Sequence, residues 1–242
     1  MKKNLILMCF ITVNTFSQNI KNSSDTKLTY KVRTQDGKVY YSPSLLVDNK
    51  VVIIEDLDGK KKYLNEGNVI GVREIINGIN YFEWKEDGFT EYVVTKVDSV
   101  KVGKLYSLVI AWIKETYENP SKVIKAEFEN NKVRVQAIKS NGLKEEMLGV
   151  RFFDISYSFE VTVRDGRYKL DALFFSLYAP TISNRNFISN GKFSQNFYNK
   201  NGQIKKSFKF FPINAEDLFN DLNLSLYSYI LKNSKSDLKD DW

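Results

Sequence analysis

The chain has 242 residues and a formal net charge of +7, and it contains one cysteine and no histidine. With no histidine and with Cys9 close to the amino terminus, the chain lacks the residues needed for Ser-His-Asp or Cys-His nucleophiles and for zinc sites with imidazole or thiolate ligands. Enzymes that work through carboxylates, lysine or tyrosine remain open. The composition nevertheless favours a protein that is not an enzyme and has no cofactor or metal.

The amino-terminal residues have the pattern of an export signal. Two lysines precede a mostly apolar run from Leu5 to Phe16, which is shorter than the ~20 apolar residues that a membrane span needs. Thr15 and Ser17 are small residues at the −3 and −1 positions of a signal cleavage site, so cleavage is predicted between Ser17 and Gln18. Cys9 lies in the middle of the run, so a lipid anchor is not expected. The sequence therefore predicts a periplasmic or secreted protein whose mature part has no integral membrane span.

Beyond residue 27 the chain is punctuated by turns, since eight of its twelve glycines follow Asp or Asn. Asx-Gly is the preferred pair for two-residue hairpin turns, because both turn positions need a positive φ. Residues 28–88 contain several such turns and no helical periodicity, which predicts a small β-barrel-like domain. Further along, a two-residue loop at 130–131 would place Phe128 opposite Val133 across a hairpin.

Two helices are predicted after residue 88. Between residues 102 and 118, apolar residues recur at three- and four-residue spacing, and a proline soon follows. A second apolar stripe begins near Asn214, which suits the N-cap position, and continues to Ile230. Trp112 lies on the apolar side of the first helix, so it is expected to be a core residue.

An Asp-Gly turn at 165–166 predicts the register of the hairpin around it. Val163 then faces Tyr168, and the same count continued along both strands pairs Tyr157 with Phe174. The positions that alternate with these are polar on the first strand, as a half-buried antiparallel strand requires.

On the second strand of that hairpin, the nominally solvated side is also apolar. Leu173, Phe175 and Leu177 form a stripe there, and exposed contiguous apolar surface usually marks an interface. These three residues are the predicted interface site, unless a β-bulge resets the alternation and buries them.

The stretch 92–178 resembles the domain of unknown function with a TATA-binding-protein-like fold that is found in exported Bacteroidetes proteins. The resemblance rests on the pairs Leu105-Tyr106, Trp112-Ile113 and Val123-Ile124 and on the hairpin from Tyr157 to Tyr168. It extends loosely to residue 233, and the chain departs from it at 135–137, where the expected glycines are missing. It implies a curved antiparallel sheet with two helices on one face, in the order β-α-β4-α. It implies neither site residues nor DNA binding, because the role of that family is unknown.

The sequence thus predicts an α+β protein with several segments. These are a signal peptide at 1–17, a linker at 18–27, the β-barrel-like domain at 28–88, a TBP-like α+β domain at 89–233 with an insertion at about 181–211, and a polar tail at 234–242.

The function expected is that of an exported binding or structural module without catalysis, with a protein or small-molecule partner in the envelope. Scattered lysines and export argue against nucleic acid. One alternative is a carrier whose cleft between sheet and helices, lined by Trp112, Phe159 and Phe174, holds an apolar molecule. A second alternative is a hydrolase using Asp154 and Glu160, but six residues of strand hold these acids roughly 20 Å apart.

Overall fold

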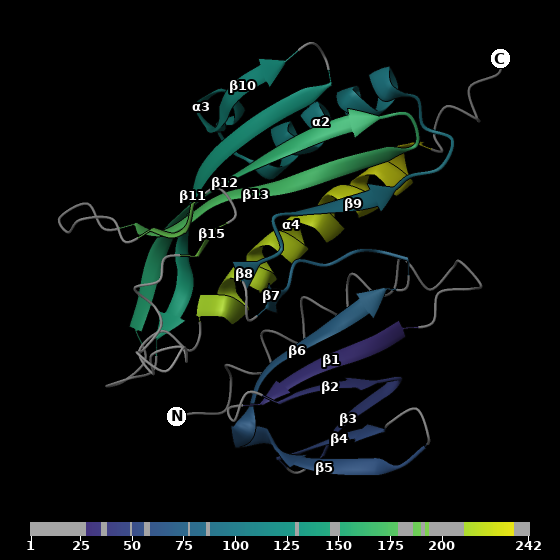
Figure 1. Cartoon of the computed structure of the whole chain (residues 1–242), viewed down its shortest axis with the longest axis vertical. Coiled ribbons are helices and arrows are strands. Elements are labelled where there is room, and N and C mark those ends of the chain that lie inside the picture. The colour runs from purple at the N-terminus through teal and green to yellow at the C-terminus, as the bar shows by residue number, and fades with distance from the viewer. Residues whose placement is uncertain are drawn as a thin grey trace. The chain divides into compact units, whose positions relative to one another are not determined.

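The computed structural model describes residues 28–34, 38–48, 50–55, 59–76, 78–85, 88–128, 131–145, 151–178, 186–189, 192–193 and 211–234. The predicted cleavage site at Ser17 and Gln18, the linker and most of the polar tail lie outside the described residues. The chain divides into two compact units, Met1–Ile79 and Asn80–Trp242 (Figure 1). The boundary falls earlier than the expected position after residue 88.

The N-terminal unit contains two three-stranded antiparallel sheets, of order β2-β1-β6 and β3-β4-β5. The first comprises β1 (Leu28–Thr34), β2 (Val39–Ser42) and β6 (Val69–Ile76), and the second β3 (Ser44–Asp48), β4 (Val51–Glu55) and β5 (Lys61–Asn65), with the 3₁₀ helix η1 (Glu66–Asn68) before β6. Only Pro43 separates β2 from β3, so one bent strand passes from sheet to sheet. The N–H of Glu55 donates to Ser42 Oγ (2.8 Å) at this corner, and Val32, Val52 and Ile54 form the small core.

The C-terminal unit is built on a seven-stranded antiparallel sheet of order β10-β11-β12-β13-β14-β15, with β9 also pairing with β13. Its strands are β9 (Tyr92–Lys96), β10 (Ile124–Phe128), β11 (Lys132–Glu145), β12 (Arg151–Arg164), β13 (Arg167–Tyr178), β14 (Asn186–Ser189) and β15 (Lys192–Phe193), and a separate hairpin joins β7 (Trp84–Lys85) to β8 (Gly88–Phe89). The first half of β13 pairs with β9 and its second half with β14. The predicted α+β class with an antiparallel sheet is confirmed.

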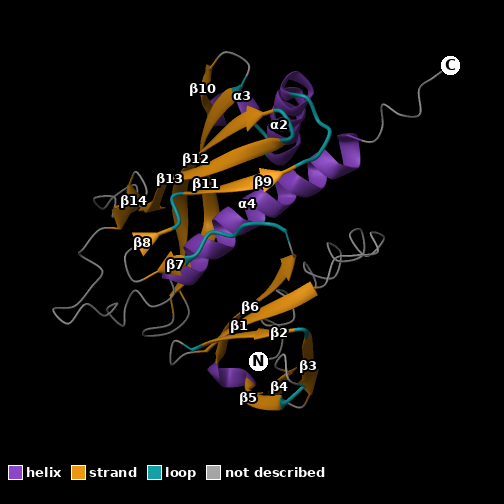
Figure 2. Ribbon diagram, turned by 45° about the vertical axis from the view of Figure 1, so that its right-hand side comes forward, coloured by secondary structure: helices purple, strands orange, loops and turns teal. Residues whose placement is uncertain are grey.

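Two long helices, α2 (Val102–Thr116) and α4 (Phe211–Ser234), cover one side of this sheet, and the short α3 (Pro120–Val123) precedes β10 (Figure 2). Buried apolar residues of α2, α4 and the facing sides of β9, β11, β12 and β13 form a single core. Trp112 is only 2% exposed, its ring centroid lies 6.0 Å from that of Phe159, and its Nε1 donates to Ser225 Oγ at 3.0 Å. Trp112 therefore joins α2, α4 and the sheet. The helix α4 begins before the predicted N-cap Asn214, because Pro212 suits a first helical turn.

A buried polar ladder binds residues 80–84, called the strap, to α4. Alternate backbone groups of the strap meet side chains on successive turns of the helix: Asn80 with Asn223, Phe82 with Asn220, and Trp84 with Glu216. The amide of Asn220 serves both backbone groups of Phe82, at 2.8 and 2.9 Å. The spacing matches because two residues of extended chain and one helical turn both advance by about 5–7 Å. This ladder places the strap in the C-terminal unit and explains the early boundary.

A β-bulge changes the register of the β12–β13 hairpin. Val163 faces Tyr168 as predicted, and the count holds as far as Phe159 opposite Ala172. The register then shifts, so that Ser158 faces Phe174 and Tyr157 faces Phe175. The predicted pair of Tyr157 with Phe174 is therefore wrong. All four residues from Ala172 to Phe175 are apolar, so the sequence does not indicate which of them face the core and which face the other side of the sheet.

The register of the β10–β11 hairpin also differs from the prediction. Phe128 faces Lys132 rather than Val133. The N–H of Asn131 donates to the carbonyl of Phe128 at 3.0 Å, so the turn closes on Asn131. The loop is one residue longer than a two-residue count allows.

Candidate functional site

The side of the sheet opposite α2 and α4, called the polar face, carries the alternate residues of β11, β12 and β13. On β12 these are Ser156, Ser158, Glu160 and Thr162, while Tyr157, Phe159 and Val161 point into the core. Period-two alternation therefore sends every second residue of each strand to this face. The charged and serine side chains of these strands therefore lie mainly on this face.

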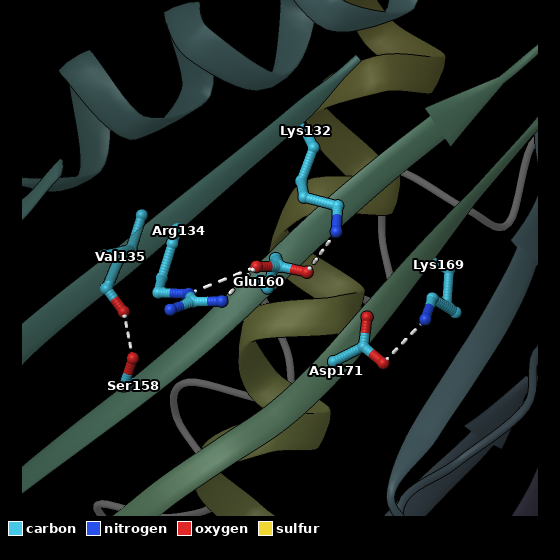
Figure 3. Close-up of polar contacts among 7 residues, drawn as sticks. All are labelled: Lys132, Arg134, Val135, Ser158, Glu160, Lys169 and Asp171. Atoms are coloured by element: carbon cyan, nitrogen blue, oxygen red, sulfur yellow. Dashed lines mark hydrogen bonds and ion pairs between the residues drawn. The ribbon is translucent and has the colours of Figure 1, made fainter. Parts of the chain in front are cut away.

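A buried carboxylate organises one end of the polar face (Figure 3). The side chain of Glu160 is 8% exposed and lies between Lys132 Nζ at 3.0 Å and Arg134 Nη2 at 2.8 Å. Burial alone would raise the pKa of Glu160, but the hydrogen bonds and charges of Lys132 and Arg134 outweigh it and hold that pKa below its usual value. The carboxylate is thus held ionised by two cations from the neighbouring strand.

The other acids of this face also have partners. Lys169 Nζ lies 2.8 Å from Asp171 Oδ1 (Figure 3). The same ammonium lies 5.0 Å from the ring centre of Tyr92. Asp154, the second acid of the hydrolase alternative, accepts a hydrogen bond from the N–H of Asn141 at 2.9 Å. Glu160 and Asp154 therefore each hold neighbouring strand residues in place.

A pocket of about 380 Å³ lies at the other end of the polar face. The residues that line it come from α3, β10, β11, β12 and β13: Lys122, Val123, Lys125, Gln136, Ala137, Ile138, Ser156, Phe174, Ser176 and Tyr178. Ser156 and Ser176 are buried, whereas Ile138 is 52% exposed, so the serines form the floor and Ile138 stands at the mouth. The volume lies within the roughly 300–1,000 Å³ of small-molecule sites.

The bulge in β13 builds one wall of this pocket. Without it, Phe174 would face Tyr157 in the core and Phe175 would take the polar side, as the uninterrupted count predicts. With the extra residue, Phe174 and Ser176 line the pocket while Phe175 is 0% exposed and packs 6.4 Å from the ring of Phe219. Bulges that re-aim side chains are common beside functional sites.

The pocket has a positive rim and a polar floor. Lys125 Nζ donates to the carbonyl of Lys122 at 2.7 Å, which fixes its ammonium at the end of α3. Neither Asp nor Glu is among the described residues that line the pocket, so these residues do not balance the charges of Lys122 and Lys125 within it. On the floor, the hydroxyl of Ser176 is buried and has no hydrogen-bond partner among the described residues.

The predicted interface of Leu173, Phe175 and Leu177 does not form an exposed stripe. Phe175 is a core residue, because the bulge moves it to the helix-covered side, and Leu173 is half-buried at the bulge itself. The side chain of Leu177 lies outside the described side chains, although its backbone faces that of Ile155.

The three residues expected to line a cleft between sheet and helices do not lie together. Trp112 and Phe159 pack against each other in the core, while Phe174 lines the pocket on the opposite side of the sheet. The pocket itself was missed by sequence reasoning. Its signal was the pair of small polar residues, Ser156 and Ser158, opposite an apolar stretch of the next strand.

Among the described residues, no group of three or more Asp, Glu, His or Cys side chains could hold a metal ion. No helix in the described part of the chain is both long enough and apolar enough to cross a membrane.

Comparisons with known proteins found a similar solved structure but no matching family model or curated protein. A solved structure of a DUF4468 family protein from Bacteroides ovatus is similar over 61% of this chain and 90% of that chain, with a TM-score of 0.47 and 9% sequence identity. At this level of similarity, the match assigns this chain neither a family nor a function.

Proposed function

We propose that this chain is an exported binding protein without catalytic activity, and that its C-terminal unit binds a small organic ligand in the pocket on the polar face. One observation carries the proposal. Among the described residues, the pocket combines apolar walls, a buried hydroxyl without a partner and lysines with no acid in the lining, in a volume suited to a small molecule. This replaces the cleft between sheet and helices as the site of a carrier.

A binding role suits the polar groups of this face better than catalysis. Glu160 is committed to Lys132 and Arg134. Asp154 faces Tyr178 across the β12–β13 ladder and accepts from the backbone of Asn141, and neither acid is among the described residues that line the pocket. General acid–base chemistry needs a titratable group within hydrogen-bond reach of a bound substrate. In the part of the chain that the structure describes, the titratable side chains that line the pocket are two lysines and Tyr178.

We further propose that the C-terminal unit has a TBP-like fold and that the protein is exported. A TBP-like arrangement is supported by the order β9, α2, β10 to β13, α4, with both helices on one side of the sheet. Export is supported by the charged start, the apolar run and the small residues before Gln18. N-terminal sequencing of the protein from its native host tests export, and a mature protein that retains Cys9 would refute the cleavage site.

The binding proposal is tested by screening a library of small organic molecules for ligands that raise the melting temperature of the purified protein, because a ligand of the folded state stabilises it. We expect hits whose effect is lost in Phe174→Ala and retained in Tyr63→Ala, a matched loss of an aromatic ring at an exposed position in the N-terminal unit. Hits that act equally on both variants, or a screen without hits, would refute the proposed site.

A further inference from the structure

The side chains around the pocket define the charge of its ligand. We infer that the pocket binds an organic anion, a carboxylate with a compact apolar body, whose charged group lies against Lys122 and Lys125 and whose body lies against Phe174 and Tyr178. This inference rests on the proposed function and adds the chemical class of the ligand.

Lys125 is placed to bind the charged group of an anion. Its ammonium is held by the Lys122 carbonyl at 2.7 Å and, having three donors, keeps two for a ligand. Elsewhere on the polar face, Lys132, Arg134 and Lys169 lie against Glu160 or Asp171. In the described part of the chain, the pocket is therefore the place on this face where lysines line a cavity with no acid among its lining residues. Asp154 faces Tyr178 across the ladder but accepts a hydrogen bond from the N–H of Asn141, so an incoming anion would supply the missing charge.

The walls of the pocket are apolar and suit an organic body. The ring of Phe174 is brought there by the bulge, and Ile138 and Tyr178 stand beside it on β11 and β13. Half-exposed apolar side chains around a cavity gain from being covered, and an aromatic or short branched body would cover them. A simple inorganic anion would leave these three side chains in water, so the apolar walls favour an organic one.

The floor supplies hydrogen bonds that an anion can use. The Ser176 hydroxyl has no acceptor among the described residues, and the Gln136 amide also lines the pocket. A hydroxyl and an amide N–H both donate to carboxylate oxygens, whereas a ligand without acceptors would leave the hydroxyl of Ser176 unpaired. Gln136 on β11 and the two lysines therefore favour the same end of the ligand. The Ser176 hydroxyl offers a further hydrogen bond on β13, the strand that also carries Phe174 and Tyr178.

The test compares two probes of nearly the same shape, 2-naphthoate and its neutral carboxamide, by isothermal titration calorimetry with the purified protein. We expect the carboxylate to bind at least about tenfold more tightly than the carboxamide at low salt, and to lose most of that advantage at 1 M salt, where charges are screened. The double variant K122Q/K125Q should lose the carboxylate preference and retain carboxamide binding. The matched control is Lys139→Gln, an exposed lysine of β11 that does not line the pocket.

The outcomes separate the two levels of the proposal. Equal binding of both probes, abolished by Phe174→Ala, would overturn the anionic class and leave the proposed pocket standing. A carboxylate preference that persists in K122Q/K125Q would also overturn it, because the charge would then be recognised elsewhere. If neither probe binds, the inferred class is refuted, and the proposed function is judged by whether neutral library compounds bind in a manner that depends on Phe174.

Discussion

The two faces of the β11–β13 sheet are made by the same three strands, yet they bury their side chains by different means. On the helix-covered side, apolar residues such as Val135, Phe159 and Leu170 are fully buried against α2 and α4. On the polar face, Glu160 and Ser158 are also buried, but each has a partner on β11: cations for Glu160, the Val135 carbonyl for Ser158. One face is thus held mainly by apolar packing and the other mainly by paired charges and hydrogen bonds. Buried polar atoms without a partner among the described residues occur on the polar face both in the pocket, at Ser176, and outside it, at Thr162 and Asp171.

The largest expected effect is at the centre of the helix-covered side. Trp112→Ala should lower the free energy of unfolding by about 4 kcal/mol, since it removes a buried aromatic ring and leaves a cavity between α2, α4 and the sheet. Chemical denaturation measures the change. If the variant keeps its stability but loses a ligand, Trp112 belongs to a binding site and the division between the two faces is wrong.

Replacing each of two neighbouring phenylalanines with alanine tests the bulge that sends them to opposite faces of the sheet. Phe175→Ala should destabilise the protein by about 3 kcal/mol because it opens a cavity next to Phe219, whereas Phe174→Ala should cost about 1 kcal/mol because that ring is half-buried at the pocket. Denaturation of both variants gives the comparison. The reverse ranking would mean that the uninterrupted register is the true one.

The polar ladder shows that the helix-covered side also contains committed hydrogen bonds. Asn220→Ala should cost about 2 kcal/mol, because the N–H and C=O of Phe82 would both remain buried without their partner. Lys232→Ala, on an exposed position of α4, is the control and should change little. Hydrogen exchange should show faster exchange of the Phe82 amide in the first variant. Unchanged exchange there would mean that the strap is held by other contacts.

The smallest effect is expected on the polar face, where the partners of the buried acid are partly exposed. Glu160→Gln should cost about 1 kcal/mol at pH 7. The pKa of Glu160 is lowered in the folded protein, so its contribution is present above its unfolded value, near 4.5, and disappears as pH falls through the lower folded value. The stability difference from wild type should therefore shrink in acid. A constant difference from pH 7 to pH 3 would mean that the pair with Lys132 and Arg134 contributes nothing.

Sequence reasoning succeeded where local chemistry decides the structure. The Asp-Gly turn at 165–166 predicts the register of its hairpin correctly as far as Phe159, because the turn itself sets the pairing. It fails beyond Ala172, where an unbroken apolar run gives alternation no phase and the gain from burying Phe175 against α4 decides. The pocket depends on that non-local choice and on α3 meeting β11. Composition and periodicity therefore predict the class of fold and the helix-covered core, but not the site.

The strap also sets the point in chain synthesis at which the C-terminal unit can complete its folding. The strap and α4 meet across 138 positions of sequence, and α4 is the final described element. The sheets of the N-terminal unit need nothing beyond Ile76 and can close early. The backbone of Phe82 waits until Asn220 has emerged, so every intervening strand is made before the core can be sealed. Such a long-range closure predicts a slow last step in folding, and a chain stalled before α4 would expose the part of the sheet's apolar side that α4 covers.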